Sequence, residues 1–507
     1  MRRFGLLGAV LLVLGVVYLA AWRTQPGPSA GTGQQASQTA AVTSVTRSCP
    51  PSPNTGAAHI AMIALPSRAV AASAGKVGAG SATLSSVPAT PATSGTGAQG
   101  AGGAKGAKKA TTAAPQPVTV SAPGALTTIT APGAPSGQAP AGTAVAASGQ
   151  MAEGFEAEQA DASGMGLVTC THPGSDMWFV GTGTGDGASS ITLYLMNTGD
   201  LAASVNVTIL TDAGLQSGLS TGITVAPHQS LTQPIAPYVQ GSGAVALHVQ
   251  TSSGQVAASV WENGGSGGAW LPQAAAPGTS MVIPGLTVAS SAAKLFVTVP
   301  GPSDAKLTVT AFTAQGKFVQ FGSTPVDAPA AATSSFALSS LGASAAGLEL
   351  TSNVPIVVAV QVPGQGIGSF TTAVPPLTEQ GVVAGNPATR GLTVGLLLTA
   401  PAGAAHASVT VIGAAGSGSG TAGSPQVVAV PAGRTEAVAV PRPQNGRQPF
   451  AIVITPGAGS GPLYAARVVT EGSGGLSAPL DSLLPVPNAP TVISLPPVQN
   501  AYPAILP

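Results

Sequence analysis

The side chains that could do chemistry are few and scattered along this chain. It has five histidines, His59, His172, His228, His248 and His406. None of them stands in an H-x-x-x-H pair or beside a cysteine, as the ligands of a zinc site usually do. The sequence therefore predicts no metal site built on histidine.

Acidic side chains are concentrated in one stretch, MAEGFEAEQAD at residues 151–161. It holds Glu153, Glu156, Glu158 and Asp161, and it fits either a short helix or an exposed strand edge. The carboxylates lack the ordered spacing and the glycine of a calcium loop. We therefore interpret the stretch as a solvated face.

Glycine-rich stretches of this chain resemble phosphate-binding loops and the G-x-S-x-G motif of esterases, but they lack the residues or the sequence context that those functions need. GTGTGDG at 181–187 does not fit G-x-G-x-x-G, and no G-K-[ST] follows it, so a strand–turn connection is predicted. G-x-S-x-G occurs around Ser220 and Ser266, but neither serine stands between a buried strand and a helix. The sequence predicts no catalytic residue and no cofactor.

Tryptophan is the remaining candidate for ligand contact. Trp178, Trp261 and Trp270 could form a platform on which sugars stack. The alternative, which we favour, is that these side chains cap the cores of β domains.

The N-terminal residues predict where in the cell the protein lies. Phe4–Trp22 is a run of 19 uncharged residues, which at about 1.5 Å per residue just crosses a hydrocarbon core of roughly 30 Å. Arg2 and Arg3 precede it, which favours a cytoplasmic N-terminus. We expect a single-pass signal anchor in the cell membrane with the bulk of the chain extracytoplasmic; a cleaved signal peptide is the main alternative.

Two cysteines in an exported chain favour one structural disulfide, between Cys49 and Cys170. Both lie close to proline in turn-like sequence. The bridge would close a loop of about 120 residues, for which chain entropy gives an upper figure of roughly 5 kcal/mol. Two unpaired thiols are the alternative.

Composition limits the partners and the fold. Lys+Arg 17 against Asp+Glu 16 leaves a net charge of +1, which gives no electrostatic reason for a nucleic-acid partner. Gly 68 and Pro 46 disfavour long helices. Short runs rich in Val and Thr between Gly and Pro predict an all-β chain.

Repeated strand–turn–strand patterns organise the second half of the chain. One set covers 191–210, 294–313 and 392–412, and another covers 244–260, 346–362 and 450–469. Their spacing of roughly 100 residues predicts tandem immunoglobulin- or fibronectin-like β-sandwich domains. A β-propeller is the alternative, although its blades would be shorter, about 40–50 residues.

The predicted organisation follows the chain in seven parts. They are a cytoplasmic tip and signal-anchor helix at 1–23, a flexible linker at 24–46, an irregular β domain at 47–173 with a disordered insert at 88–115, β-sandwiches at 174–275, 276–376 and 377–478, and a Pro-rich tail at 479–507.

Short motifs carry a family resemblance. They are the turn at Cys170–Pro173, WFVG at Trp178–Gly181, L-x-L-x-N-x-G-D at Leu193–Asp200, GQVAASV at Gly254–Val260 and NVPIVVAVQ at Asn353–Gln361. With them the chain resembles, from Cys49 to about Ser477, an uncharacterised family of anchored, secreted actinobacterial proteins known only as a domain of unknown function. The resemblance implies an envelope location and β domains, and it implies no catalytic residue. The insert at 88–115 departs from it.

We expect a non-enzymatic extracytoplasmic envelope protein that acts as a scaffold or binding stalk. Its partners would be the membrane, through the N-terminal helix, and an envelope protein or glycan. A cell-wall carbohydrate-binding protein and an enzyme with an unrecognised site are the alternatives. A glycan binder should show an exposed aromatic cluster, and an enzyme should show a pocket holding acid or base groups with perturbed pKa values.

Overall fold

The computed structural model describes residues 39–53, 58–66, 78–90, 116–118, 123–131, 141–161, 166–219, 222–287, 292–322, 325–338, 341, 345–364, 366–414, 422–443, 448–472, 475 and 480–494. These residues are all-β, as predicted, and their only helices are two single 3-10 turns, η1 (Gly149–Met151) and η2 (Ala236–Tyr238). The predicted signal anchor lies outside the described residues. No helix of the described part is long and apolar enough to cross a membrane.

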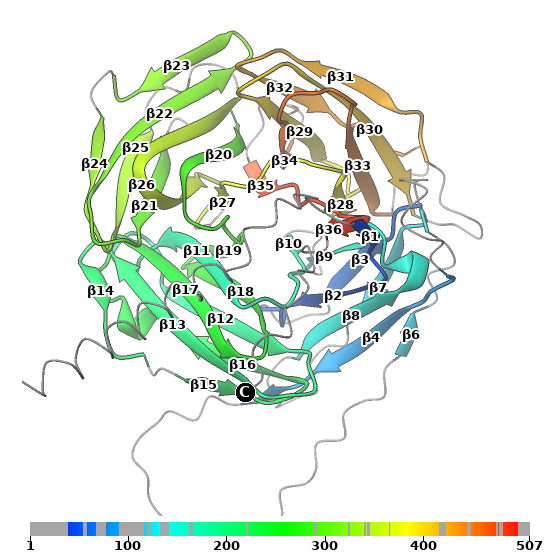
Figure 1. Ribbon diagram of the computed structural model, residues 1–507, viewed down its shortest axis with the longest axis horizontal. Helices are drawn as coiled ribbons and strands as arrows, with labels where there is room; N and C mark the ends of the chain where they lie inside the picture. The colour runs from blue at the N-terminus through cyan, green and yellow to red at the C-terminus, as the bar shows by residue number, and fades with distance from the viewer. Residues whose placement is uncertain are drawn as a thin grey trace, which may run out of the picture. The chain divides into compact units, whose positions relative to one another are not determined.

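The strands between residues 44 and 485 fall into four repeats with one pairing plan (Figure 1). Each repeat supplies two antiparallel sheets. We number the strands of a repeat from one to eight along the chain. In the first sheet the order of neighbouring strands is 1, 6, 3 and 4, and in the second sheet it is 8, 7, 2 and 5.

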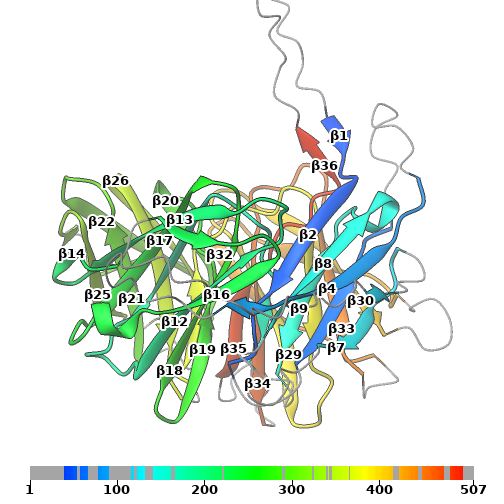
Figure 2. The same ribbon diagram turned by 90° about the horizontal axis from the view of Figure 1, so that it is seen from below.

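Repeat 1 (residues 44–169) and repeat 2 (residues 176–271) each fill all eight places. Repeat 1 consists of β2 (Ser44–Cys49), β3 (His59–Ile63), β4 (Ala82–Val87), β6 (Gln116–Val118), β7 (Thr127–Thr130), β8 (Gly142–Ser148), β9 (Glu156–Ala160) and β10 (Val168–Thr169). Repeat 2 consists of β11 (Asp176–Thr182), β12 (Ser190–Asn197), β13 (Ala203–Thr211), β14 (Gly214–Gln216) with β15 (Ile223–Val225), β16 (Gln229–Pro234), β17 (Ala244–Ser253), β18 (Ala257–Gly264) and β19 (Gly267–Leu271). Figure 2 shows β2, β8 and β4 side by side, in the order in which they pair.

Repeat 3 (residues 278–372) and repeat 4 (residues 381–485) follow the same plan. Repeat 3 consists of β20 (Gly278–Leu286), β21 (Ala293–Val299), β22 (Ala305–Thr313), β23 (Gly316–Gln320) with β24 (Val326–Ala328), β25 (Ala332–Leu338), β26 (Ala346–Val362) and β27 (Ser369–Thr372). Repeat 4 consists of β28 (Gly381–Asn386), β29 (Leu392–Ala400), β30 (Ala405–Gly413), β31 (Gln426–Val430), β32 (Arg434–Ala439), β33 (Phe450–Pro456), β34 (Tyr464–Glu471) and β35 (Leu480–Pro485).

In repeat 3 one long strand, β26, takes both the sixth and the seventh place. Its residues 346–352 pair with β22 in the first sheet, and its residues 357–361 pair with β21 in the second. Pro355 lies between these two segments, where the strand passes from one sheet to the other. A proline is tolerated there because it has no N–H to donate to a ladder.

The sheets of consecutive repeats pack face to face, and the succession closes on itself within the compact unit 41–493. Apolar clusters cross every junction: Val87 with Met196 between repeats 1 and 2, Phe296 and Phe370 in the repeat 2 core, Leu397 and Val468 in the repeat 3 core, and Val382 and Val453 with Ile63 and Leu126 between repeats 4 and 1. Figure 1 shows the sheets of the four repeats arranged in a ring, with β10, β19, β27 and β35 near its centre.

The ring does not confirm the finer fold prediction of tandem sandwich domains. Four-stranded sheets packed around a common axis are the organisation of a β-propeller, although here each repeat of roughly 100 residues supplies two neighbouring sheets. Immunoglobulin-like sandwiches are not confirmed, because that fold places its first, second, fourth and fifth strands in one sheet. A sheet inside the ring is covered on both faces, which explains why β28 is buried at every position and β29 at all but Thr393.

The strand–turn–strand patterns are connections between sheets. In 191–210 the two strands are β12 and β13, which pair with other strands and not with each other. The same holds for β17 and β18 in 244–260. Alternation predicts that a segment is a strand, but the choice of partner depends on long-range packing.

Parts of the predicted linker, insert and tail form strands. β1 (Thr39–Ala41) pairs with β36 (Val492–Ser494), and β5 (Ala89–Thr90) pairs in parallel with β16 of repeat 2. β35 pairs with β34 inside repeat 4. β1 and β5 have little apolar bulk of their own and gain ladder hydrogen bonds from their partner strands, whereas β35 also buries Leu480, Leu483 and Leu484.

Candidate functional site

A cavity of about 560 Å³ lies where the inner strands of the ring meet. Three repeats and the segments that follow the four repeats line it. Repeat 1 contributes Arg47, Glu156 and residues 168–169; repeat 2 contributes Asp176, Trp178, Phe179, residues 258–259 and residues 270–271; repeat 4 contributes Leu484 and Pro485; the segments after the repeats contribute residues 170–172, 272–276, 374–375 and 486–488. Most of these side chains are apolar.

The segments after the repeats face the cavity because proline interrupts the ladders there. Pro272 follows β19, Pro375 follows β27, and Pro485 and Pro487 end repeat 4. A proline donates no hydrogen bond, so a segment rich in proline cannot extend a central strand. Each chain segment therefore leaves its sheet near the centre of the ring, which we call the hub, and the segments after β19 and β27 cross to the next repeat.

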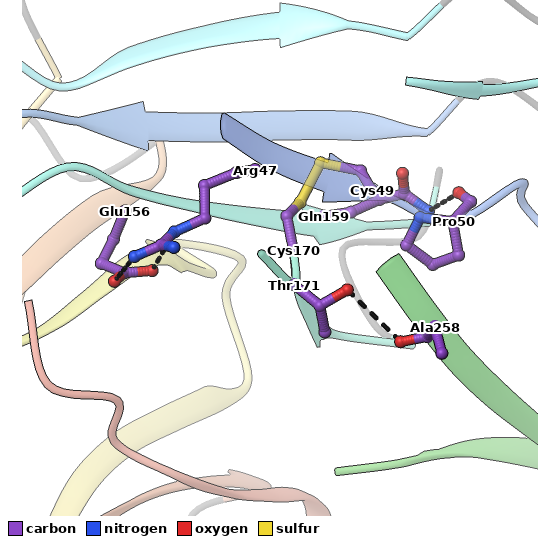
Figure 3. The surroundings of a disulfide bond; sticks show 8 residues. All are labelled: Arg47, Cys49, Pro50, Glu156, Gln159, Cys170, Thr171 and Ala258. Atoms are coloured by element: carbon purple, nitrogen blue, oxygen red, sulfur yellow. Dashed lines mark hydrogen bonds and ion pairs between the residues drawn. A yellow bond between two sulfur atoms is a disulfide. The ribbon is translucent and has the colours of Figure 1, made fainter. Parts of the chain in front are cut away.

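An ion pair forms the charged part of the wall. The guanidinium of Arg47, in β2, donates from Nε to Glu156 Oε2 (3.2 Å) and from Nη2 to Glu156 Oε1 (2.5 Å), as Figure 3 shows. Both side chains are buried. Burial raises the pKa of Glu156, and the Arg47 guanidinium opposes that rise. Because both carboxylate oxygens are bound, this acid is held as a structural partner.

A second buried pair lies beside the first. Glu158, two residues along β9, lies 2.6 Å from Nη2 of Arg467 in β34 and accepts a hydrogen bond from the Gly385 N–H (2.9 Å). The acidic run is thus not a solvated face, since Glu153, Glu156 and Glu158 are all buried. The available signal was Arg467, a single charge inside the apolar run YAARVV, which has to be paired if it is buried.

A disulfide joins Cys49 and Cys170, the pair named from the sequence, with a Cα–Cα distance of 4.4 Å. Cys49 ends β2 and Cys170 follows β10, so the bridge links the innermost strands of the two sheets of repeat 1 (Figure 3). The backbones of Ser48 and Thr171 exchange two hydrogen bonds beside it (2.7 and 3.0 Å). The hydroxyl of Thr171 donates to the carbonyl of Ala258 in repeat 2 (3.3 Å). These bonds hold the wall segment 168–171 in place.

The three tryptophans are buried, with exposed fractions of 4% for Trp178, 7% for Trp261 and 4% for Trp270. Trp178 stacks on His248, with ring centroids 3.8 Å apart, and Nε2 of His248 lies 3.0 Å from Oδ1 of Asp176. Trp270 packs edge-on against Trp261. The rings fill the inner edge of repeat 2, and no exposed aromatic platform forms among them.

The glycine-rich motifs serve structure. In GTGTGDG, Asp186 binds Nζ of Lys294 through both carboxylate oxygens (2.6 and 2.5 Å), which ties repeat 2 to repeat 3. Ser266 lies in the turn between β18 and β19, and Ser220 lies outside the described residues. Within the described part of the chain, no three His, Cys, Asp or Glu side chains gather as metal ligands would.

Glu262 is a further buried acid outside the cavity. Glu262, in β18, accepts hydrogen bonds through Oε2 from the Thr182 N–H (3.3 Å) and hydroxyl (2.7 Å). Burial raises the pKa of Glu262 to about 8, and the two bonds from Thr182 oppose the rise. Its carboxyl therefore holds a proton at neutral pH.

The comparisons with known proteins add a family. No curated protein matches the chain. A model of a family of unknown function matches residues 118–441, from the end of β6 in repeat 1 to just beyond β32 in repeat 4. The matched range is shorter than the range from Cys49 to about Ser477 over which the motifs show a resemblance, but it covers more than half of the chain. The chain belongs to this family, DUF5719.

Proposed function

We propose that this protein is a non-enzymatic extracytoplasmic binding protein of the cell envelope, anchored through Phe4–Trp22, whose ligand occupies the hub cavity. The observation that carries the proposal is the cavity itself. Its volume of about 560 Å³ falls in the range of small-molecule sites, which are mostly apolar and contain a few placed polar groups. Such sites often lie where several units of a fold meet.

The lining favours binding over catalysis. The buried acid Glu156 has both oxygens bound to Arg47. Asp176 is bound to His248. A general acid or base needs an atom within reach of the substrate proton. Both oxygens of Glu156 and Oδ1 of Asp176 are bound within the protein, and Nδ1 of His172, the histidine of the lining, lies 3.0 Å from the Pro173 carbonyl. The four repeats then serve as the scaffold that presents the cavity, in keeping with the scaffold role expected from the sequence.

The uncharged fluorescent probe N-phenyl-1-naphthylamine tests this proposal. We expect saturable binding of one probe per wild-type chain. Ala276 is exposed and lines the cavity, so Ala276→Trp should obstruct the entrance without disturbing the core. Ala202, equally exposed but remote from the cavity lining, gives the matched control Ala202→Trp, which should bind as the wild type does. No binding, or equal binding by both variants, would contradict the proposal.

The envelope location has its own test. N-terminal sequencing of the protein recovered from a membrane fraction should find residues before Trp22 retained. A start near Gln25 would mean that the apolar run is a cleaved signal peptide. Recovery from the cytoplasm would contradict an extracytoplasmic role.

A further inference from the structure

We infer that the hub cavity takes an uncharged, largely apolar ligand that carries a hydroxyl group, in the manner of a long-chain alcohol. The inference rests on the proposed function and names the chemistry of its ligand. Three features of the wall carry it: the apolar surface, the internal pairing of its charges, and one buried hydroxyl without a partner.

The apolar part of the wall comes from all around the ring. Trp178 and Trp270 of repeat 2 face the cavity together with Leu484 and Val486 of repeat 4 and Val374 after repeat 3. Burial of apolar ligand surface against such groups is favourable in proportion to the area removed from water. The wall therefore selects for a ligand with an extended apolar body.

The charges of the wall disfavour a charged ligand. Of the lining residues, Arg47 is the one with a guanidinium or an ammonium group, and Glu156 holds it through two hydrogen bonds. Glu156 takes two of the five guanidinium N–H groups, so a carboxylate or phosphate at the remaining ones would lie close to a buried carboxylate of the same charge. Like charges that share a buried site are unfavourable.

A cationic ligand finds no better partner. Asp176 is the second carboxylate of the wall, but it is bound to His248, and 56% of its side chain is exposed. Its charge is therefore screened by water at the rim and is not available as a counter-ion in the interior. The ligand that fits the interior carries no net charge.

The hydroxyl of Ser259 gives the site its polar contact. Ser259 lies in β18, lines the cavity and is 2% exposed, and its Oγ has no hydrogen-bond partner among the described residues. Buried hydroxyls are nearly always satisfied, and a hydroxyl both donates and accepts. On the same wall the Thr171 hydroxyl already binds the carbonyl of Ala258. A hydroxyl group of the ligand would give Oγ of Ser259 a hydrogen-bond partner.

Displacement of N-phenyl-1-naphthylamine from the full-length protein tests the ligand class with three molecules of equal chain length. Decanol should displace the probe, whereas decanoate and decylammonium at pH 7.5 should be at least about tenfold weaker, because each has to bury a charge. Ser259→Ala should weaken the binding of decanol about fivefold more than it weakens the binding of the probe, because one hydrogen bond to decanol is lost. Ser259→Thr, which keeps the hydroxyl, should bind decanol as the wild type does.

The outcomes separate the two proposals. If the wild type does not bind the probe, both the proposed function and this inference fail. If the probe binds but decanoate or decylammonium displaces it as well as decanol does, only the ligand class is overturned. Equal weakening of probe and decanol by Ser259→Ala would overturn the role of the hydroxyl.

Discussion

Two junctions of the ring bury their faces with different chemistry. Repeats 3 and 4 meet through apolar side chains and close backbone approach. A Cβ added at Gly347 in β26 would lie 2.4 Å from Oγ1 of Thr399 in β29. The Thr399 hydroxyl donates to the carbonyl of Pro284 (2.6 Å), and the Gly347 N–H donates to the Thr435 hydroxyl (2.9 Å). Shape and hydrogen bonds, one of them from the Arg434 guanidinium to the carbonyl of Ala314, hold these repeats together.

Repeats 4 and 1 meet through a buried ion pair as well as an apolar cluster. Glu158 of β9 binds Arg467 of β34 and the N–H of Gly385 in β28. Glu158 and Gly385 are 227 positions apart in the sequence. Consecutive repeats are tethered by a short connector, and the ion pair between repeats 2 and 3, Asp186 with Lys294, is only partly buried. The closing contact has no such tether, and a directional pair gives it a defined register.

The largest expected effect comes from breaking the ion pair between Glu158 and Arg467, which joins repeat 4 to repeat 1. Arg467→Met leaves Glu158 buried without its cation and should lower the free energy of unfolding by about 3–5 kcal/mol. Urea unfolding followed by tryptophan fluorescence measures it. Arg467→Met/Glu158→Met should recover most of the loss, since paired apolar replacements are well tolerated.

The control for this prediction is an arginine at the other junction. Arg434 of β32 donates one hydrogen bond to the carbonyl of Ala314 (2.8 Å) and pairs with no carboxylate. Arg434→Met should cost only about 1 kcal/mol. Equal losses in the free energy of unfolding for Arg467→Met and Arg434→Met would show that the two junctions do not differ in this way.

Removing the disulfide should have the next largest effect. Cys49→Ala/Cys170→Ala should lose about 2–5 kcal/mol, because the bridge closes a long loop and fixes the repeat 1 side of the closing junction. Peptide mapping without reduction should find Cys49 linked to Cys170 in the exported protein. Free thiols at both positions would contradict the bridge.

A smaller loss is expected where repeats 3 and 4 approach closely. Gly347→Ala would place a methyl group against the buried Thr399 side chain and should cost about 1–3 kcal/mol. Gly301→Ala is the control: an added Cβ there meets nothing within 4 Å, and the change should stay within about 0.5 kcal/mol. Equal unfolding midpoints for the two variants would count against close packing at this junction.

The smallest effect lies inside repeat 2, away from both junctions. Folding raises the pKa of Glu262 from 4.5 to about 8, so between these pH values the folded chain keeps a proton that the unfolded chain releases. Stability from this group is full below the unfolded pKa and is lost as pH rises toward 8. Between pH 6 and pH 7 the loss should be about 1 kcal/mol.

Glu262→Gln isolates this contribution, because the amide does not titrate. Its unfolding midpoint should fall less between pH 6 and pH 7 than that of the wild type. Arg467→Met and Gly347→Ala should retain the wild-type slope, since distant sites act additively. An unchanged slope in Glu262→Gln would show that this carboxyl does not titrate in the range.

The sequence predicted strands and repeats, but it led us to assign buried carboxylates to the surface. The period-2 pattern of β13 and the spacing of the repeats were visible in the sequence, and Cys49 and Cys170 were paired by composition alone. The carboxylates of β9 were assigned to solvent, because their partners Arg47 and Arg467 lie 109 and 309 positions away from Glu156 and Glu158 along the chain. Ser259 had no distinguishing pattern at all.

By itself, the sequence determined the class of structure, since alternation, β-branched side chains and frequent Gly and Pro leave short strands as the stable local choice. It also determined the repeat length. Only the tertiary structure decided which strands pair, that each repeat supplies two sheets to one ring, and that a cavity forms at the hub. Those outcomes depend on burying both faces of every sheet at once, a long-range condition that no local pattern expresses.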